Sequence, residues 1–302
     1  MLIRKGGMLQ AFPPFKTKEV TMRTSRIFIL LFVLAVWALM PVTVDAADWI
    51  KQGDEMFYFE GGAFFPAFET KLRVDSASIG EGTDIDLEND LDFNDRETTY
   101  RLGGYWRFLS RHRIAVSYFN FNRDASATLN KEITIGDEVY PIGARVESEF
   151  KFQVIPITYM YSFMKREKFE FSGGLGLHWY RIDFKAKGDA SLGNEDLDAD
   201  ITAKADVPLP LLGLRFDYHF TPKWSAGLLG EIFWLNTGSD TFKFSGSVVN
   251  LRLSTEYWFF NNLGLGAALN WFDLSADVED DEWKGKLDYN YWGPQIYVAV
   301  RF

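Results

Sequence analysis

The sequence predicts an all-β fold: an antiparallel up-and-down transmembrane β-barrel of about ten strands, with about eight or twelve as the other possibilities. Three observations predict it. An export signal precedes the main part of the chain, apolar and polar residues alternate throughout that part, and short polar turns alternate with long acidic connections. Aromatic residues make up 17% of the sequence, a level that suits strands and membrane interfaces.

The N-terminal region has the features of an export signal. Basic residues within 22–26 precede an unbroken apolar run over 27–40, and Val44 and Ala46 are the small residues that signal peptidase reads. The apolar run is shorter than the roughly 20 residues that a membrane-spanning helix needs. We therefore expect export through the inner membrane to the bacterial outer membrane. The predicted parts of the chain are an upstream extension from a wrongly assigned start codon (1–21), a cleaved signal peptide (22–46) and the barrel (47–302).

Alternation with a period of two residues is clear in residues 145–154. Phe150 and Phe152 fall on one face of the predicted strand, and Glu149 and Lys151 fall on the other. In a membrane barrel we expect the apolar face to contact lipid and the polar face to line the lumen. The predicted strands lie near residues 55–67, 98–109, 113–124, 144–164, 169–186, 201–220, 224–235, 242–260, 263–276 and 283–302.

The connections between these strands fall into two classes that alternate along the chain. One class is short and flanked by aromatic residues, and the other is longer and acidic. Short turns at one rim and long loops at the other are typical of an outer-membrane barrel, with periplasmic turns and extracellular loops. The short connections are residues 110–112, 165–168, 221–223 and 261–262, and the long ones are 69–97, 124–143, 187–200, 236–240 and 277–282.

The C-terminal strand alternates apolar residues and ends on an aromatic one. Ile296, Val298, Val300 and Phe302 share one face. This strand resembles the terminal signal that barrel-assembly machinery recognises, and the mature chain resembles the small outer-membrane β-barrel proteins of the OmpA/OmpW-like group. The resemblance rests on the strand pattern and implies that the assembly machinery, outer-membrane lipid and lipopolysaccharide are partners.

The inward positions of the predicted strands are rich in charge. Both signs occur, and a narrow lumen would force opposite charges to pair because an unpaired buried charge is costly. Two interpretations remain open: a salt-bridged plug that stiffens the barrel, or a narrow polar pore. The predicted network comprises Glu60, Arg101, Arg107, Glu147, Glu149, Lys151, Arg215, Asp217, Glu231, Arg252 and Glu256.

Composition excludes several classes of function. The chain has no cysteine, which excludes disulfides, thiol catalysis and zinc–thiolate sites. Its net charge of −10 argues against a nucleic-acid partner. Exposed aromatic residues such as Trp106, Trp224, Trp258 and Trp271 are expected to anchor the barrel at the membrane interfaces.

Enzymatic barrels are the next class to test. An outer-membrane protease of the omptin type would need acidic residues and an Asp–His pair together at the extracellular rim. Asp84 and Asp86 are expected in an outer loop, whereas Asp217 and His219 precede a turn at the opposite rim. A lipid A deacylase would need a His-x-Ser pair facing the bilayer, and His178 is expected to face inward. We therefore predict that the protein is not an enzyme.

The first long loop offers a weak candidate site for a divalent cation. Asp84, Asp86, Glu88 and Asp90 alternate there, and clustered carboxylates can bind Ca²⁺ or Mg²⁺. No other cofactor is expected. The predicted function is a non-enzymatic outer-membrane protein with a structural or surface-interaction role. The alternative is a narrow channel for small polar solutes or ions, and the oligomeric state stays open.

Overall fold

The computed structural model describes residues 50–302, apart from 77–79, 193–194, 240–241 and 281–282. The predicted extension at 1–21 and the predicted signal peptide at 22–46 lie outside the described residues. Within the described part, no helix is long and apolar enough to cross a membrane.

The described chain is built almost entirely of strands. One short helix, α2 (Leu87–Asp90), and one small hairpin, β6 (Ile133–Ile135) and β7 (Glu138–Tyr140), lie in connections between them. The strands of the main sheet are β1 (Phe57–Phe64), β2 (Ala67–Ser76), β3 (Ile85–Asp86), β4 (Thr99–Leu109), β5 (His112–Thr128), β8 (Arg145–Lys165), β9 (Phe169–Leu192), β10 (Glu195–Thr221), β11 (Trp224–Gly238), β12 (Phe242–Trp258), β13 (Leu263–Asp280) and β14 (Trp283–Arg301).

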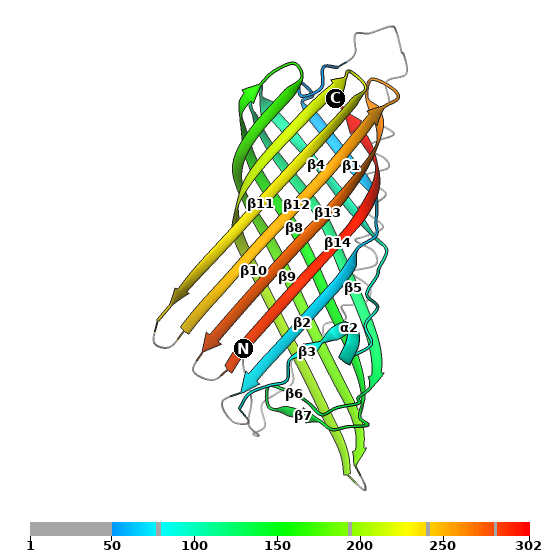
Figure 1. Ribbon diagram of the computed structural model, residues 1–302, viewed down its shortest axis with the longest axis vertical. Helices are drawn as coiled ribbons and strands as arrows, with labels where there is room; N and C mark the ends of the chain where they lie inside the picture. The colour runs from blue at the N-terminus through cyan, green and yellow to red at the C-terminus, as the bar shows by residue number, and fades with distance from the viewer. Residues whose placement is uncertain (1–49, 77–79, 193–194, 240–241, 281–282) are drawn as a thin grey trace, which may run out of the picture. The chain divides into compact units, whose positions relative to one another are not determined.

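The sheet closes on itself as an antiparallel up-and-down barrel, which confirms the predicted fold class (Figure 1). Its first and last strands pair, from Tyr58 opposite Arg301 to Phe64 opposite Gln295. After a break at Pro66, β2 continues along the same partner, opposite residues 283–292 of β14. Strands β1 and β2 are therefore two halves of one stave, and the described ring has ten staves, as the pattern predicted.

Both kinds of predicted connection are present, at opposite ends of the barrel. We call them the turn end and the loop end. The turn between β4 and β5, residues 110–111, lies at the turn end. Strand β1 begins and strand β14 ends at the same end. The strands run further toward the loop end than predicted. Strand β9 continues to Leu192, and β10 already begins at Glu195. The expected loop at 187–200 is thus mostly strand.

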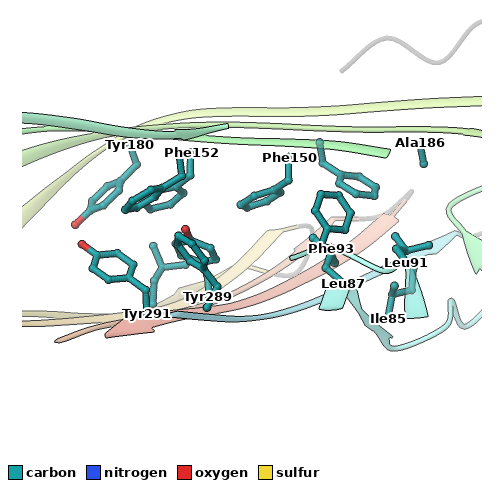
Figure 2. Close-up of a cluster of buried hydrophobic side chains, with 14 of the residues drawn as sticks. Ile85, Leu87, Leu91, Phe93, Phe150, Phe152, Tyr180, Ala186, Tyr289 and Tyr291 are labelled. Carbon is teal, nitrogen blue, oxygen red and sulfur yellow. The ribbon is translucent and has the colours of Figure 1, made fainter. Parts of the chain in front are cut away.

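Aromatic side chains fill the interior toward the loop end. Phe150, Phe152 and Tyr180 project from one wall and meet Tyr289 and Tyr291 from the opposite wall (Figure 2). All of them are buried. We call the buried hydrophobic cluster to which they belong the aromatic plug, and it also includes residues of β1, β5 and β13.

The aromatic plug corrects one expectation. The alternation in β8 is as predicted, but its direction is reversed, because the apolar face turns inward to the plug. Glu147 is exposed, and Glu149 and Lys151 are half-buried on the outside of the wall. These three residues therefore do not line the lumen. The physical reason is that this part of β8 has an apolar interior and a water-facing exterior.

The ring of paired strands is incomplete at two places toward the loop end. At the first, β1 pairs with β4 only as far as Phe64 and Thr99, and β2 has only the two residues of β3 on that side. At the second, strand β10 pairs with β11 only between Leu212 and Thr221, whereas its pairing with β9 continues to Glu195. Strand β11 likewise continues to Gly238 with β12 as a partner. Figure 1 shows β10 and β11 diverging toward the loop end from the point where their pairing stops. We call this gap in the pairing the β10–β11 seam.

Candidate functional site

The candidate site is the polar half of the lumen, between the aromatic plug and the turn end. Its outermost part is a buried ion pair in which Arg107 of β4 donates two hydrogen bonds to Glu170 of β9, each 3.0 Å long. Ser162 also donates to Glu170. Planar guanidinium and carboxylate groups suit such paired geometry, so the two strands are fixed relative to one another across the lumen.

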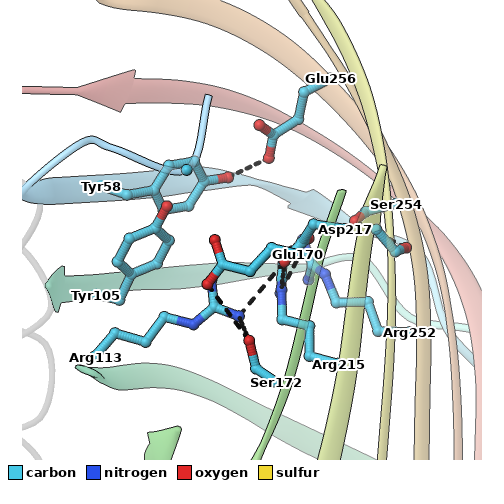
Figure 3. Close-up of polar contacts among 12 residues, drawn as sticks. Tyr58, Tyr105, Arg113, Glu170, Ser172, Arg215, Asp217, Arg252, Ser254 and Glu256 are labelled. Atoms are coloured by element: carbon cyan, nitrogen blue, oxygen red, sulfur yellow. Dashed lines mark hydrogen bonds and ion pairs between the residues drawn. The ribbon is translucent and has the colours of Figure 1, made fainter. Parts of the chain in front are cut away.

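A second ion pair lies beside the first. Asp217 of β10 accepts from Arg215 at 2.7 Å and from Arg113 of β5 at 3.4 Å, and Arg113 also reaches Ser172 (Figure 3). Each carboxylate thus has arginine partners. The predicted pairing of opposite charges is present here, with Arg113 as a member that the sequence analysis missed.

Tyrosine hydroxyls complete this region. Tyr58 and Tyr297 both donate to Glu256, and Tyr105 donates to Glu55. The rings of Tyr58 and Tyr105 are stacked at 4.9 Å between centroids. Hydrogen bonding from phenols satisfies carboxylates that no arginine reaches, which keeps the interior polar without leaving bare charge.

A middle layer follows toward the plug. Arg252 of β12 contacts Glu60 of β1 at 2.9 Å and donates to Gln295 of β14 at 2.7 Å. Across the lumen, Glu231 accepts from Asn250 at 2.7 Å, and the ring of His178 lies 3.3 Å from the same side chain. Arg252 thus links β12 to β14 and β1, and His178 links β9 to β11, which are not neighbouring strands in the ring.

Two small cavities lie in the polar half, among the described residues. One cavity of about 50 Å³ lies among Arg107, Glu170 and Asp217, and one of about 100 Å³ lies near Glu60 and Arg252. Spaces of this size hold a few waters. Of the predicted network, the structure places Glu60, Arg101, Arg107, Arg215, Asp217, Glu231, Arg252 and Glu256 around this polar lumen, and Glu147, Glu149 and Lys151 outside it.

The connections at the loop end cover the plug from outside. Leu87 and Leu91, at the two ends of α2, and Ile133 and Ile135 of β6 are buried in the same hydrophobic cluster. We call this cover, residues 80–97 together with β6 and β7, the lid. It packs against the plug through these four buried side chains.

A buried arginine holds the lid in place. Arg123 of β5 donates to Glu88 of α2 at 2.6 Å, to the Asn94 carbonyl at 2.7 Å and to Thr70 of β2 at 3.0 Å. Its guanidinium also lies over the ring of Phe68, 4.6 Å from the centroid. No sequence pattern singled out Arg123, because its partners are far apart in the chain.

The four loop carboxylates of the predicted cation site have separate partners. Glu88 pairs with Arg123, and Asp90 pairs with Lys131 at 2.8 Å. Asp86, the N-cap of α2, accepts from the backbone amide of Asn89, and Asp84 is exposed, 3.7 Å from Arg73. Asp90 also accepts from the backbone amide of Asp86 at 2.9 Å, but the four carboxylates do not form one cluster. No group of three potential metal ligands occurs among the described residues.

All three histidines lie away from the loop end. His112 is in β5 beside the first turn, His178 is in the middle layer, and His219 precedes the turn after β10. His178 is buried, with 1% of its surface exposed. The Asp–His pair that an extracellular active site would need is therefore not formed at the lid.

The outer wall carries a belt of exposed apolar side chains with tryptophans toward the loop end. On four strands a tryptophan points outward, and the residue two positions nearer the loop end, on the same face, is polar. Trp258, expected in this belt, is instead buried inside beneath Arg301. The four outward pairs are Trp179 and Arg181, Trp234 and Asn236, Trp271 and Asp273, and Trp292 and Asn290.

Beyond the belt, the outer wall is charged. Glu149 lies between Lys151 and Lys185, at 2.5 and 2.9 Å. On β2, Arg73 donates to Asp75 and this hydrogen bond holds the pKa of the Asp75 carboxyl below its usual value. Strands β2, β8 and β9 thus present ion pairs on the same outer face that is apolar nearer the turn end.

Comparison with known proteins supports the architecture. The sequence matches no protein-family model and no curated protein. Among solved structures, the outer membrane protease OmpT from Escherichia coli is similar, with a TM-score of 0.55 and 10% identity over 85% of this chain and 100% of that chain. The fold is that of an outer-membrane β-barrel. The outer membrane protein OprG from Pseudomonas aeruginosa also matches, with a TM-score of 0.41 and 13% identity over 84% of this chain and 99% of that chain.

The C-terminal strand of this barrel has the predicted alternation. Ile296 and Val298 are exposed on the outer wall, whereas Gln295, Tyr297 and Arg301 face inward and are buried. Val300 and Phe302 continue the outward face, although Val300 is itself covered. Recognition of this strand by assembly machinery stays a prediction.

Proposed function

We propose that the protein is a sealed, non-enzymatic outer-membrane barrel whose role is to hold a charged wall and a packed lid outside the cell. The aromatic plug is the observation that carries this proposal. Side chains from opposite walls pack there in direct contact, with the rings of Phe152 and Tyr289 4.4 Å apart. A lumen filled in this way supports a rigid scaffold rather than a conduit.

The placement in the membrane follows from the outer wall. We take the apolar belt as the lipid-facing zone, the turn end as periplasmic and the loop end as extracellular. Export by the signal at 22–46 and insertion by the assembly machinery, acting on Ile296, Val298, Val300 and Phe302, belong to the same proposal.

The charged wall gives the proposal a partner. Its ion pairs, such as Glu149 with Lys185, begin directly beyond the belt, at the height where phosphate groups of outer-membrane lipid and lipopolysaccharide would lie. Lysines in these pairs can exchange a carboxylate for a lipid phosphate. We therefore propose lipopolysaccharide as the neighbour of this surface, with nucleic acid excluded by the net charge of −10.

A narrow channel is the second candidate, and the water-sized cavities in the polar half favour it. The cavity near Glu60 and Arg252, of about 100 Å³, would be one segment of a path for small polar solutes. Such a path would have to cross the plug and the lid. We therefore rank it below the sealed barrel.

Conductance of the refolded chain in a planar bilayer separates the two candidates. We expect no current steps from protein whose insertion is verified by protease protection of its strands. Reproducible discrete steps would refute the sealed barrel and establish the channel. A change of ion selectivity in Arg252→Gln would then identify the polar lumen as the path.

A further inference from the structure

The β10–β11 seam leaves two neighbouring strands without partners on one side. Beyond Leu212 on β10 and Ile232 on β11, the described strands pair with one another no further. Each keeps its other neighbour, β9 or β12. The other gap in the pairing toward the loop end, between β2 and β5, is spanned by the lid, which pairs with β2 through β3 and contacts β5 through Arg123.

Two prolines explain why the pairing stops. Pro208 and Pro210 lie on β10 directly beyond Leu212, and both stay in register with β9, opposite Trp179 and Leu177. A proline has no N–H, so it is tolerated in a strand where that donor would point to a free edge. The edge of β10 that faces β11 therefore lacks two N–H donors. Without these donors, an added peptide strand would also pair poorly with β10 at this point.

The seam begins on the lipid side of the proposed membrane interface. On β11, Ile232 lies two residues nearer the turn end than Trp234, the outward tryptophan that marks the interface on that strand. On β10, Leu212 lies six residues nearer the turn end than Asp206, which accepts from Trp179. The opening therefore starts in lipid and continues outward past the tryptophans.

An apolar surface runs through this opening from the outer wall to the interior. Leu212 and Trp234 are exposed on the outside. Leu211 and Phe233, the next residues on the two strands, belong to the buried hydrophobic cluster, and Leu209 packs against it. The five side chains named along this surface are all uncharged.

We propose that the β10–β11 seam is a binding site for one hydrocarbon chain of a bilayer lipid. The proposal rests on the membrane placement given above. A hydrocarbon chain needs neither donors nor acceptors, so the missing amides of the two prolines cost it nothing. It also covers apolar edge residues that would otherwise face water where the seam widens. The surrounding outer leaflet supplies such chains at high local concentration.

The test uses the full mature chain in bilayers that contain a phospholipid with a photoreactive diazirine in its acyl chain. After illumination, the labelled residues are identified by mass spectrometry. We expect labelling of Leu209 and Phe233, whose side chains face the interior, besides labelling of Leu214 and Leu228 on the outer wall. Labelling confined to Leu214 and Leu228 would overturn the seam proposal while upholding membrane placement. Absence of labelling at those two residues would overturn both.

A variant that restores the two donors tests the cause. In P208T/P210T, we expect longer β10–β11 pairing and a fall of about threefold or more in labelling of Leu209 and Phe233, with Leu214 and Leu228 unchanged. Pro222→Thr, in the turn after β10, is the matched control and should leave the labelling pattern as in the wild type. Equal labelling of Leu209 in the wild type and P208T/P210T would overturn the proposal.

Discussion

At the residue scale, the buried pair of Arg107 and Glu170 shows what holds the polar lumen together. Both side chains are almost wholly buried, and each would be costly in this place without the other. The arginine is also near the Tyr105 ring. The pair therefore matters for stability mainly because the loss of one member would leave a buried charge without a partner. The net attraction between the two groups matters less.

Removing one member should therefore destabilise the barrel strongly. For Arg107→Met we expect the free energy of unfolding to fall by about 3 kcal/mol, because Glu170 is left charged and unpaired. Urea titration of the protein refolded into liposomes measures it. Arg96→Met is the control: Arg96 is 82% exposed by its side chain and lies 3.9 Å from Asp95, so its loss should cost less than about 0.5 kcal/mol. A similar cost for both variants would contradict the argument.

Arg123 acts at the same scale on the lid. Its three hydrogen bonds converge from β5 on groups of β2, α2 and the segment after α2. For Arg123→Met we expect proteinase K to cut within residues 80–97 about tenfold faster, because the lid opens more often when this side chain is lost. Lys131→Met, at a half-exposed pair with Asp90, should leave the rate near that of the wild type. Equal rates in both variants would show that hydrophobic packing alone retains the lid.

At the element scale, β8 shows how far sequence reasoning reaches. Alternation predicted the strand and the partition of its residues into two faces correctly, because side chains in a strand point to opposite sides. It could not say which face turns inward. Inside a barrel with a polar lumen the charged face is inward, and around an aromatic plug the assignment is reversed. Trp258 differs: it lies on the inward face of β12, in a second buried cluster with Tyr58 and Tyr297.

Adjacent residues of β8 give a direct test of that direction. The chain has no natural cysteine, so each introduced thiol is unique. We expect Glu149→Cys to react rapidly with a membrane-impermeant maleimide added outside cells, and Ser148→Cys, whose position is 5% exposed, to react far more slowly. Unfolded protein in urea, where both should react alike, is the control. Faster reaction at position 148 would reverse the orientation of β8.

Strand β10 carried a signal that the sequence analysis did not use. Two prolines in a predicted central strand argue for an unpaired edge, and Pro208 and Pro210 indeed mark the place where pairing with β11 ends. Strand length was underestimated at β9 and β10 for a different reason. Acidic residues are typical of loops, although strands outside a membrane can expose charge on both faces.

At the scale of the whole molecule, the fold class was predictable and the state of the lumen was not. Alternating strands, two classes of connection and the terminal strand specify an up-and-down barrel before any contact is known. Whether the lumen is open depends on how side chains from distant strands meet. Phe152 and Tyr289 are 137 positions apart in sequence numbering, so only the closed ring brings their rings together.

Opening the plug should therefore change the behaviour of the entire barrel. For the double variant F152A/Y289A we expect conductance steps in a planar bilayer where the wild type is silent, because two opposed rings are removed. The control L177A/L214A removes exposed side chains of the outer wall and should stay silent. If F152A/Y289A inserts with the wild-type strand content and carries no current, other parts of the plug or the lid suffice to seal the lumen.

The incomplete pairing of β10 with β11 also divides the barrel mechanically. Where a ring of strands is closed by hydrogen bonds, its circumference is fixed by strand number and stagger, and it cannot widen without breaking a ladder. Beyond Leu212 and Ile232 no ladder crosses between these two strands. The part toward the turn end is thus a tube of fixed girth. Beyond it, β5 and β8 to β10 form one run of paired strands, and β11 to β14 with β2 form another. These two runs can move apart or together with every described strand pair intact.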